Sequence, residues 1–194
     1  MVGAYGPFAR VLMLAVAILL PPALMPEARA GEKSGLTYIV PVAAGSADTP
    51  ENRPAMPDLL FADGSSMPQA LHRYLGQVIV INFWASWCGP CIKEMLYLDR
   101  LQGDFRGQPL SVLAISEDQG GIAAVKQFLT RQKYTFLRPL ADPGASMAQA
   151  LAVKGLPTSI IVDRHGRQVM RVAGPYQWDS PQIVARLKML MSEP

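Results

Sequence analysis

The stretch Val78-Ile-Val-Ile-Asn-Phe-Trp-Ala-Ser-Trp-Cys-Gly-Pro-Cys91 decides the fold. Its first half is a continuous run of β-branched and aromatic residues, as a strand buried on both faces requires. Its second half contains two cysteines, Cys88 and Cys91, directly ahead of a stretch with apolar residues at helical spacing that ends near Gly103. The pattern predicts a buried strand that leads a Cys-x-x-Cys pair into the first turn of a helix.

A helix N-terminus suits a reactive thiol. Unpaired backbone N–H groups and the helix dipole favour an anion there, so the thiolate of Cys88, which is the attacking species, is stabilised. Gly89 keeps the turn open, and Pro90 fits the first turn, where no N–H is needed. Cys91 lies one turn further in, where it can displace a mixed disulfide formed at Cys88. The spacing therefore predicts thiol–disulfide exchange.

Metal binding is the main alternative for a Cys-x-x-Cys pair. Zinc needs four ligands, and the only histidines, His72 and His165, stand at unsuitable spacings. A copper(I)-delivery module that holds the metal through the two cysteines, with His165 as third ligand, remains a second hypothesis. A structural disulfide would close a very short loop and stabilise little. We therefore expect no metal and no dissociable cofactor, the redox group being the Cys88–Cys91 disulfide itself.

Residues 1–30 have the features of an export signal. Arg10 precedes the apolar run 11–20, and Ala28-Arg29-Ala30 matches the small-x-small pattern of a cleavage site. The run is much shorter than the about 20 residues of a membrane-spanning helix. We expect a cleaved signal peptide, or alternatively a membrane anchor, and a periplasmic or otherwise extracytoplasmic protein. That compartment permits disulfides.

The rest of the chain divides into a linker and one domain. Residues 31–57, rich in Gly, Ala, Ser and Pro, are expected to form a flexible linker, ordered in part near 36–40, and residues 58–194 the folded domain. The chain has 18 basic and 15 acidic residues, which are scattered and leave a net charge of +3. This weak bias does not indicate a nucleic-acid partner.

The order of predicted elements indicates an α/β fold. Strands are expected at 59–61, 78–83, 110–115, 136–137, 158–162 and 167–173, and helices at 70–75, 89–103, 122–130, 145–151 and 181–191. This is a parallel β–α–β half followed by a β-hairpin and a terminal helix.

Two separated motifs resemble the thioredoxin superfamily. Phe83-Trp-Ala-Ser-Trp-Cys-Gly-Pro-Cys91 is similar to its active-site segment, and Gly155-Leu-Pro-Thr158 to its cis-proline loop. Within it the chain resembles the exported TlpA/ResA/DsbE-type reductases, because of the lead-in 57–64, the acid three residues after the second cysteine, and the long stretch between the motifs. The resemblance covers about residues 57–191. It implies a thioredoxin-like fold, a central mixed sheet flanked by helices, with an N-terminal β-hairpin extension and a central β–α insert.

The resemblance also implies roles for individual residues. Cys88 is expected to be the nucleophile and Cys91 the resolving thiol. Asn82 stands where plain thioredoxin has a buried Asp and cannot take a proton. Glu94, one helical turn from Cys91, is therefore the candidate proton handler, and a solvated surface acid is its alternative interpretation. Leu96 occupies a position where many relatives have Pro.

The remaining candidate residues surround the cysteines. Trp84 is expected to pack against the motif, and Trp87 to be partly exposed as a contact surface for substrate. A cis bond before Pro157 would leave the backbone of Leu156 free to pair with an extended substrate.

The resemblance implies reduction of disulfides in client proteins, with apocytochromes c or copper-site proteins as clients and a membrane thiol carrier as electron donor. The dipeptide Gly89-Pro90 is typical of reducing members. A disulfide oxidase or isomerase of the same fold is the alternative.

Overall fold

The computed structural model describes residues 38–41 and 48–194. The predicted signal peptide or anchor, residues 1–30, lies outside the described residues, as does most of the segment 31–47. Within the described ranges, no helix combines the length and the apolar character needed to cross a membrane.

The described residues contain eight strands and four α-helices. The strands are β1 (Tyr38–Pro41), β2 (Leu60–Ala62), β3 (Pro68–Ala70), β4 (Val78–Trp84), β5 (Leu110–Ser116), β6 (Leu140–Ala141), β7 (Thr158–Val162) and β8 (Gln168–Ala173). The α-helices are α1 (Gly89–Asp104), α2 (Gly121–Gln132), α3 (Ser146–Ala150) and α4 (Pro181–Ser192), and two 3-10 helices are η2 (Pro50–Asn52) and η3 (Leu71–Tyr74).

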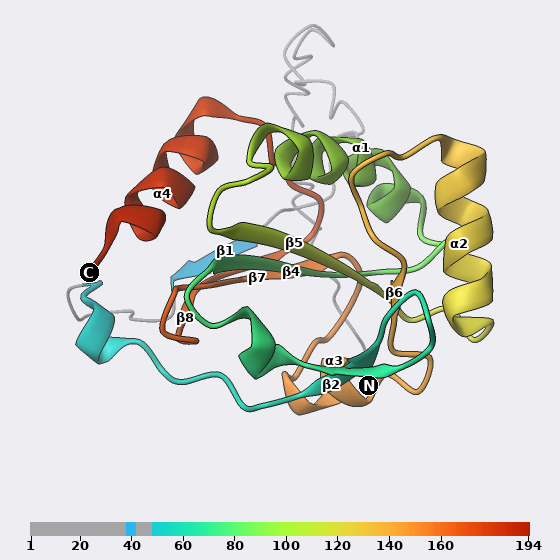
Figure 1. Ribbon diagram of the computed structural model, residues 1–194, viewed down its shortest axis with the longest axis horizontal. Helices are drawn as coiled ribbons and strands as arrows, with labels where there is room; N and C mark the ends of the chain where they lie inside the picture. Colours follow the sequence, from blue (N-terminus) through green and yellow to red (C-terminus); the bar gives the residue numbers. More distant parts are fainter. Residues whose placement is uncertain (1–37, 42–47) are drawn as a thin grey trace, which may run out of the picture. The chain divides into compact units, whose positions relative to one another are not determined.

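The strands of the described residues form one mixed sheet in the order β1-β8-β7-β4-β5-β6-β2-β3 (Figure 1). The central strand β4 pairs with β5 in parallel and with β7 antiparallel. Every residue of β4, β5 and β7 is buried, because helices cover both faces. Helices α1 and α4 lie over one face and α3 lies over the other (Figure 1).

The alternation of side chains along β4 divides the core in two. Val80 and Trp84 pack on the face covered by α1, α2 and α4, whereas Ile81 and Phe83 pack on the face covered by α3. Successive side chains of a strand point to opposite faces of the sheet. An apolar run that does not alternate with polar residues, as in β4, therefore requires a sheet that is buried on both faces. Asn82, the one polar residue of β4, therefore faces α1.

The predicted architecture is confirmed. The parallel unit β4–α1–β5, the hairpin β7–β8 and the terminal helix α4 occur in the expected order. The N-terminal hairpin β2–β3 extends the sheet beyond β6. Between β5 and β7, where a central β–α insert was expected, the chain forms α2, β6 and α3.

Two local predictions are wrong. Phe136 and Leu137 do not form a strand, because their backbone N–H groups and that of Thr135 donate to the buried carboxylate of Asp99 on α1. The strand comes slightly later, as β6. The helix predicted at 70–75 is only the 3-10 turn η3, because Pro68–Ala70 pairs with β2 instead.

Two parts of the predicted linker 31–57 are fixed to the domain: one near 36–40, where partial order was expected, and one at Arg53, where it was not. Strand β1 pairs with β8 at one edge of the sheet. Arg53 is only 5 % exposed and forms ion pairs with Asp163 and Glu193. Arg53 also pairs with the nearby Asp48, but the two partners that fix it to the domain stand far along the chain, so the local composition did not reveal this anchoring.

Candidate active site

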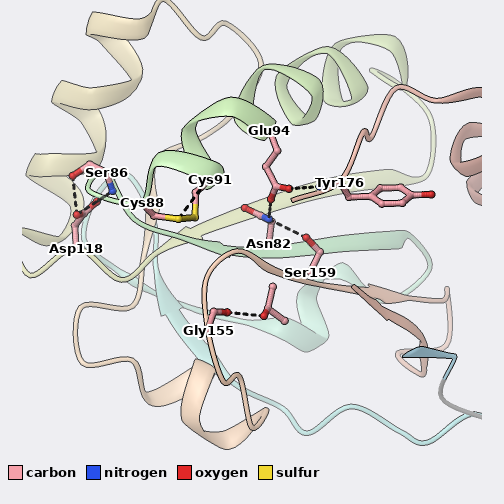
Figure 2. Close-up of a disulfide and its surroundings, with 10 residues drawn as sticks. Asn82, Ser86, Cys88, Cys91, Glu94, Asp118, Gly155, Ser159 and Tyr176 are labelled. Carbon is pink, nitrogen blue, oxygen red and sulfur yellow. Dashed lines mark hydrogen bonds between the residues drawn. A yellow bond between two sulfur atoms is a disulfide. The ribbon is translucent and has the colours of Figure 1, made fainter. Parts of the chain in front are cut away.

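Cys88 and Cys91 lie where β4 ends and α1 begins, and are joined by a disulfide with their Cα atoms 5.3 Å apart (Figure 2). Cys88 is the N-cap of α1, and its sulfur accepts a hydrogen bond from the backbone N–H of Cys91 at 3.3 Å. Cys91 is fully buried and Cys88 is 6 % exposed. Of the two cysteines, Cys88 is therefore the less buried one.

The position of Cys88 favours its thiolate in the reduced protein. The N–H that contacts its sulfur belongs to the first turn of α1, where backbone donors have no partner within the helix. These donors and the positive end of the helix dipole stabilise a negative charge on the sulfur. Pro90 occupies the first turn, where its missing N–H costs nothing. The arrangement suits a nucleophilic thiol at Cys88 and a covered second thiol at Cys91.

Asp118 holds the loop between β4 and the cysteines, a residue that sequence reasoning missed. Its buried carboxylate accepts hydrogen bonds from the backbone N–H and hydroxyl of Ser86 and from the hydroxyl of Ser116. Trp84 and Ser116 are partners at the ends of β4 and β5. The carboxyl ends of parallel strands meet at one edge of a sheet. The polar run Ser-Glu-Asp at the end of the buried strand β5 could therefore have indicated that Asp118 lies near the cysteines.

Glu94 is buried beneath α1, 1 % exposed. Its carboxylate accepts hydrogen bonds from the amide of Asn82 at 2.5 Å and from the backbone N–H of Tyr176 at 2.8 Å (Figure 2). Burial raises the pKa of Glu94 to about 7, against the opposing effect of these hydrogen bonds. Glu94 is thus not a solvated surface acid, and it changes protonation near neutral pH.

Asn82 connects Glu94 to the sheet. Its amide nitrogen also donates to the hydroxyl of Ser159 on β7 at 2.9 Å, while its carbonyl oxygen is buried without a hydrogen-bond partner among the described residues. Asn82 therefore binds two side chains, those of Glu94 and Ser159. The segment between β8 and α4 covers this site, and its Trp178 is fully buried with its ring 5.1 Å from that of Tyr176. No sequence pattern pointed to these two aromatic residues.

The loop before β7 carries the expected cis bond, between Leu156 and Pro157. The hydroxyl of Thr158 donates to the carbonyl of Gly155 (Figure 2), and the carbonyl of Pro157 accepts from Gly174. Within the described part of the chain, the backbone groups of Leu156 make no hydrogen bond. A strand-like peptide can therefore pair with Leu156.

The two tryptophans of the motif differ in environment. Trp84 is fully buried, with its ring 4.8 Å from that of Phe128 on α2, so it packs as expected. Trp87 is 71 % exposed and lines, together with Leu156, a hollow of about 310 Å³ beside the cysteines. Gly89 and Pro90 are exposed at the start of α1.

His165 does not lie with the cysteines. It is in the turn after β7, whose opposite end, Thr158, pairs with Phe83 near the active site. The five residues of β7 separate the two ends by about 13 Å at about 3.3 Å per residue. His165 therefore cannot be the third ligand of a copper ion held by Cys88 and Cys91. Across residues 48–194, no three His, Cys, Asp or Glu side chains are grouped as a metal site requires.

Comparison with known proteins agrees with this geometry. The Redoxin family model matches residues 50–185. Thiol-disulfide oxidoreductase ResA of Bacillus thuringiensis subsp. konkukian is 30 % identical over 119 residues, which are 61 % of this chain and 67 % of that protein. A thiol:disulfide interchange protein DsbE from Chlorobium tepidum superposes with a TM-score of 0.64 at 24 % identity, over 72 % of this chain and 97 % of that one.

The exposed lipoprotein thioredoxin of Streptococcus pneumoniae superposes with a TM-score of 0.59 at 25 % identity, over 69 % of this chain and 100 % of that one. The Redoxin match spans more than half of the chain and contains both cysteines and the loop at Pro157. The chain therefore belongs to the Redoxin family of the thioredoxin superfamily and is a thiol–disulfide oxidoreductase of the ResA type.

Proposed function

We propose that the protein is an exported reductase that transfers electrons to the disulfides of client proteins. The observation that carries the proposal is the arrangement of the cysteines. Cys88 caps a helix and keeps a small exposed fraction, whereas Cys91 lies fully covered one turn further in. A nucleophile at a helix N-terminus, less covered than the resolving thiol behind it, suits exchange with a protein disulfide.

The reaction begins with the protein in its dithiol form. The thiolate of Cys88 attacks one sulfur of the client disulfide, which forms a mixed disulfide and releases the other client sulfur as a thiolate. Cys91 then loses its proton and attacks the sulfur of Cys88. The client leaves with both of its thiols reduced, and Cys88 and Cys91 hold the disulfide seen in the structure. Two electrons pass to the client.

Glu94 is the proposed acceptor of the proton from Cys91. Both side chains lie on the buried side of α1, one turn apart, and the pKa of about 7 allows the carboxyl to gain or lose a proton at neutral pH. Asn82 and Tyr176 orient the carboxylate. Trp87 and Leu156 are the proposed contacts of the client, and Trp84, Gly89, Pro90 and Pro157 shape the site.

The proposed location is periplasmic or otherwise extracytoplasmic, with residues 1–30 as a cleaved signal peptide or a membrane anchor. An oxidising compartment does not supply electrons, so the protein needs a donor, proposed to be a membrane thiol carrier. The proposed clients are apocytochromes c or copper-site proteins. No dissociable cofactor enters the reaction, because the electrons reside in the cysteine pair.

The reduction potential of the Cys88–Cys91 pair tests the direction of transfer. The protein is equilibrated with defined thiol/disulfide buffers, and the fraction oxidised is measured. A value near thioredoxin's about −270 mV supports the reductase, whereas a value near DsbA's about −120 mV makes the protein an oxidase or isomerase. Cys88→Ser should abolish reduction of any disulfide, and Cys91→Ser should accumulate the mixed disulfide with a client. A Cys88→Ser variant that still reduces disulfides would refute the mechanism.

A further inference from the structure

The hollow beside the active site contains an acidic group that the proposed exchange reaction does not use. Trp87 and Leu156, the proposed client contacts, line the hollow together with Glu117. Its volume is about 310 Å³, about ten times the share of one water in the liquid. It therefore has room for a long side chain of a client that is bound at Leu156.

The carboxylate of Glu117 lacks a partner. Its Oε1 atom is buried and makes no hydrogen bond with any described residue. The backbone of Glu117 is held at the end of β5 by a hydrogen bond from its N–H to the carbonyl of Trp84. A buried carboxylate oxygen without a donor costs free energy. The other oxygen, Oε2, is not buried and has no hydrogen bond to a described residue either, so it is free to accept a donor brought by a ligand.

Among the residues that the structure describes, no basic side chain forms an ion pair with Glu117. Burial of the side chain, and to a smaller extent the negative charge of the nearby Asp142, disfavour the charged form and raise the pKa of Glu117. Asp142 accepts hydrogen bonds from the first turn of α3, including the N–H groups of Ser146 and Met147, so it offers no donor. Lys154 also lines the hollow, but no ion pair in the described part of the chain joins it to Glu117.

We propose that Glu117 forms a specificity subsite that takes a lysine or arginine side chain of the client, close in sequence to the cysteine under attack. This inference rests on the proposed function and deepens it. An extended client paired with Leu156 presents side chains alternately to its two sides, and one of them enters the hollow. The charged end of this lysine or arginine reaches Glu117. The aliphatic part of the side chain, or its charge, packs against the ring face of Trp87 at the rim of the hollow.

Peptide substrates test the subsite directly. Each peptide carries one cysteine in a mixed disulfide with a chromophoric thiol, and an arginine or a norleucine at each of the neighbouring positions in turn. The full-length protein is kept reduced with dithiothreitol, and kcat/KM is measured for each peptide. At one position the arginine peptide should exceed its norleucine partner about tenfold, as a charge-assisted hydrogen bond provides. The ratio should shrink in high salt.

Variants assign the preference to Glu117. In Glu117→Gln the ratio should fall to about one, and in Glu117→Lys it should invert and favour a glutamate peptide. Asp104→Asn removes an exposed acid at the far end of α1 and should keep the wild-type ratio. If the wild type reduces all peptides equally, or if the preference survives in Glu117→Gln, the subsite is refuted while the reductase stands. If the wild type reduces no disulfide, the proposed function fails.

Discussion

The buried carboxyl of Glu94 should make the oxidised protein less stable as the pH rises. In the folded protein the pKa of Glu94 is raised to about 7, whereas in the unfolded chain the carboxyl has its ordinary pKa of about 4.3. Between these values the folded protein holds a proton that the unfolded chain has released. The stabilisation is therefore complete below the unfolded pKa and is lost as the pH rises through the folded pKa.

The size of the effect follows from the two pKa values. One pH unit in this interval corresponds to about 1.4 kcal/mol, so the free energy of unfolding falls by about 2.5 kcal/mol between about pH 5 and about pH 8. Glu94→Gln removes the titrating group and keeps the shape of the side chain. The free energy of unfolding of Glu94→Gln, relative to that of the wild type, should thus rise by about 2.5 kcal/mol between about pH 5 and about pH 8.

Denaturant unfolding at both pH values measures the difference. Tryptophan fluorescence is a suitable signal, because Trp84 and Trp178 are fully buried in the folded protein. Groups other than Glu94 titrate in both proteins, so their contributions cancel. Asp104→Asn, which removes an exposed carboxyl from the same helix, is the matched control for the loss of a charge. An equal difference between Glu94→Gln and wild type at both pH values would show that Glu94 does not titrate as argued.

Three further predictions concern stability and client contact. Asp118→Ala leaves the donors of Ser86 and Ser116 without their acceptor, so urea unfolding should show a loss of about 2–3 kcal/mol; a loss below about 0.5 kcal/mol would contradict this. Asp99→Ala removes the acceptor of three backbone N–H groups at 135–137, and should cost about 3 kcal/mol in the same assay, with faster hydrogen exchange at those amides. Trp87→Ala truncates a side chain that is 71 % exposed; it should change stability by less than about 0.5 kcal/mol and lower kcat/KM for a peptide disulfide about tenfold. An unchanged kcat/KM would mean that Trp87 does not contact the client.

Misplaced local elements show where sequence patterns reach their limit. Phe136 and Leu137 have high β propensity, yet a carboxylate 36 or more positions earlier takes their N–H groups. β propensity describes the backbone conformation that the local sequence favours. A hydrogen-bond acceptor from a distant part of the chain, here the carboxylate of Asp99, overrides that preference. Arg53 is a similar case, because its ion pairs with Asp163 and Glu193 join residues more than a hundred positions apart.

By itself, the sequence determined the fold class and the chemistry of the cysteine pair. Both follow from contiguous patterns: the uninterrupted apolar run of β4, the spacing of Cys88 and Cys91, and the helical periodicity of α1 are local properties of the chain. Only the tertiary structure decided how the surrounding acids behave. Glu94 and Glu117 look alike in sequence, and their protonation depends on burial and on donors contributed by distant segments. Those segments meet because strands that run in the same direction bring their carboxyl ends to one edge of the sheet. This is a consequence of the fold, and local sequence patterns do not predict it.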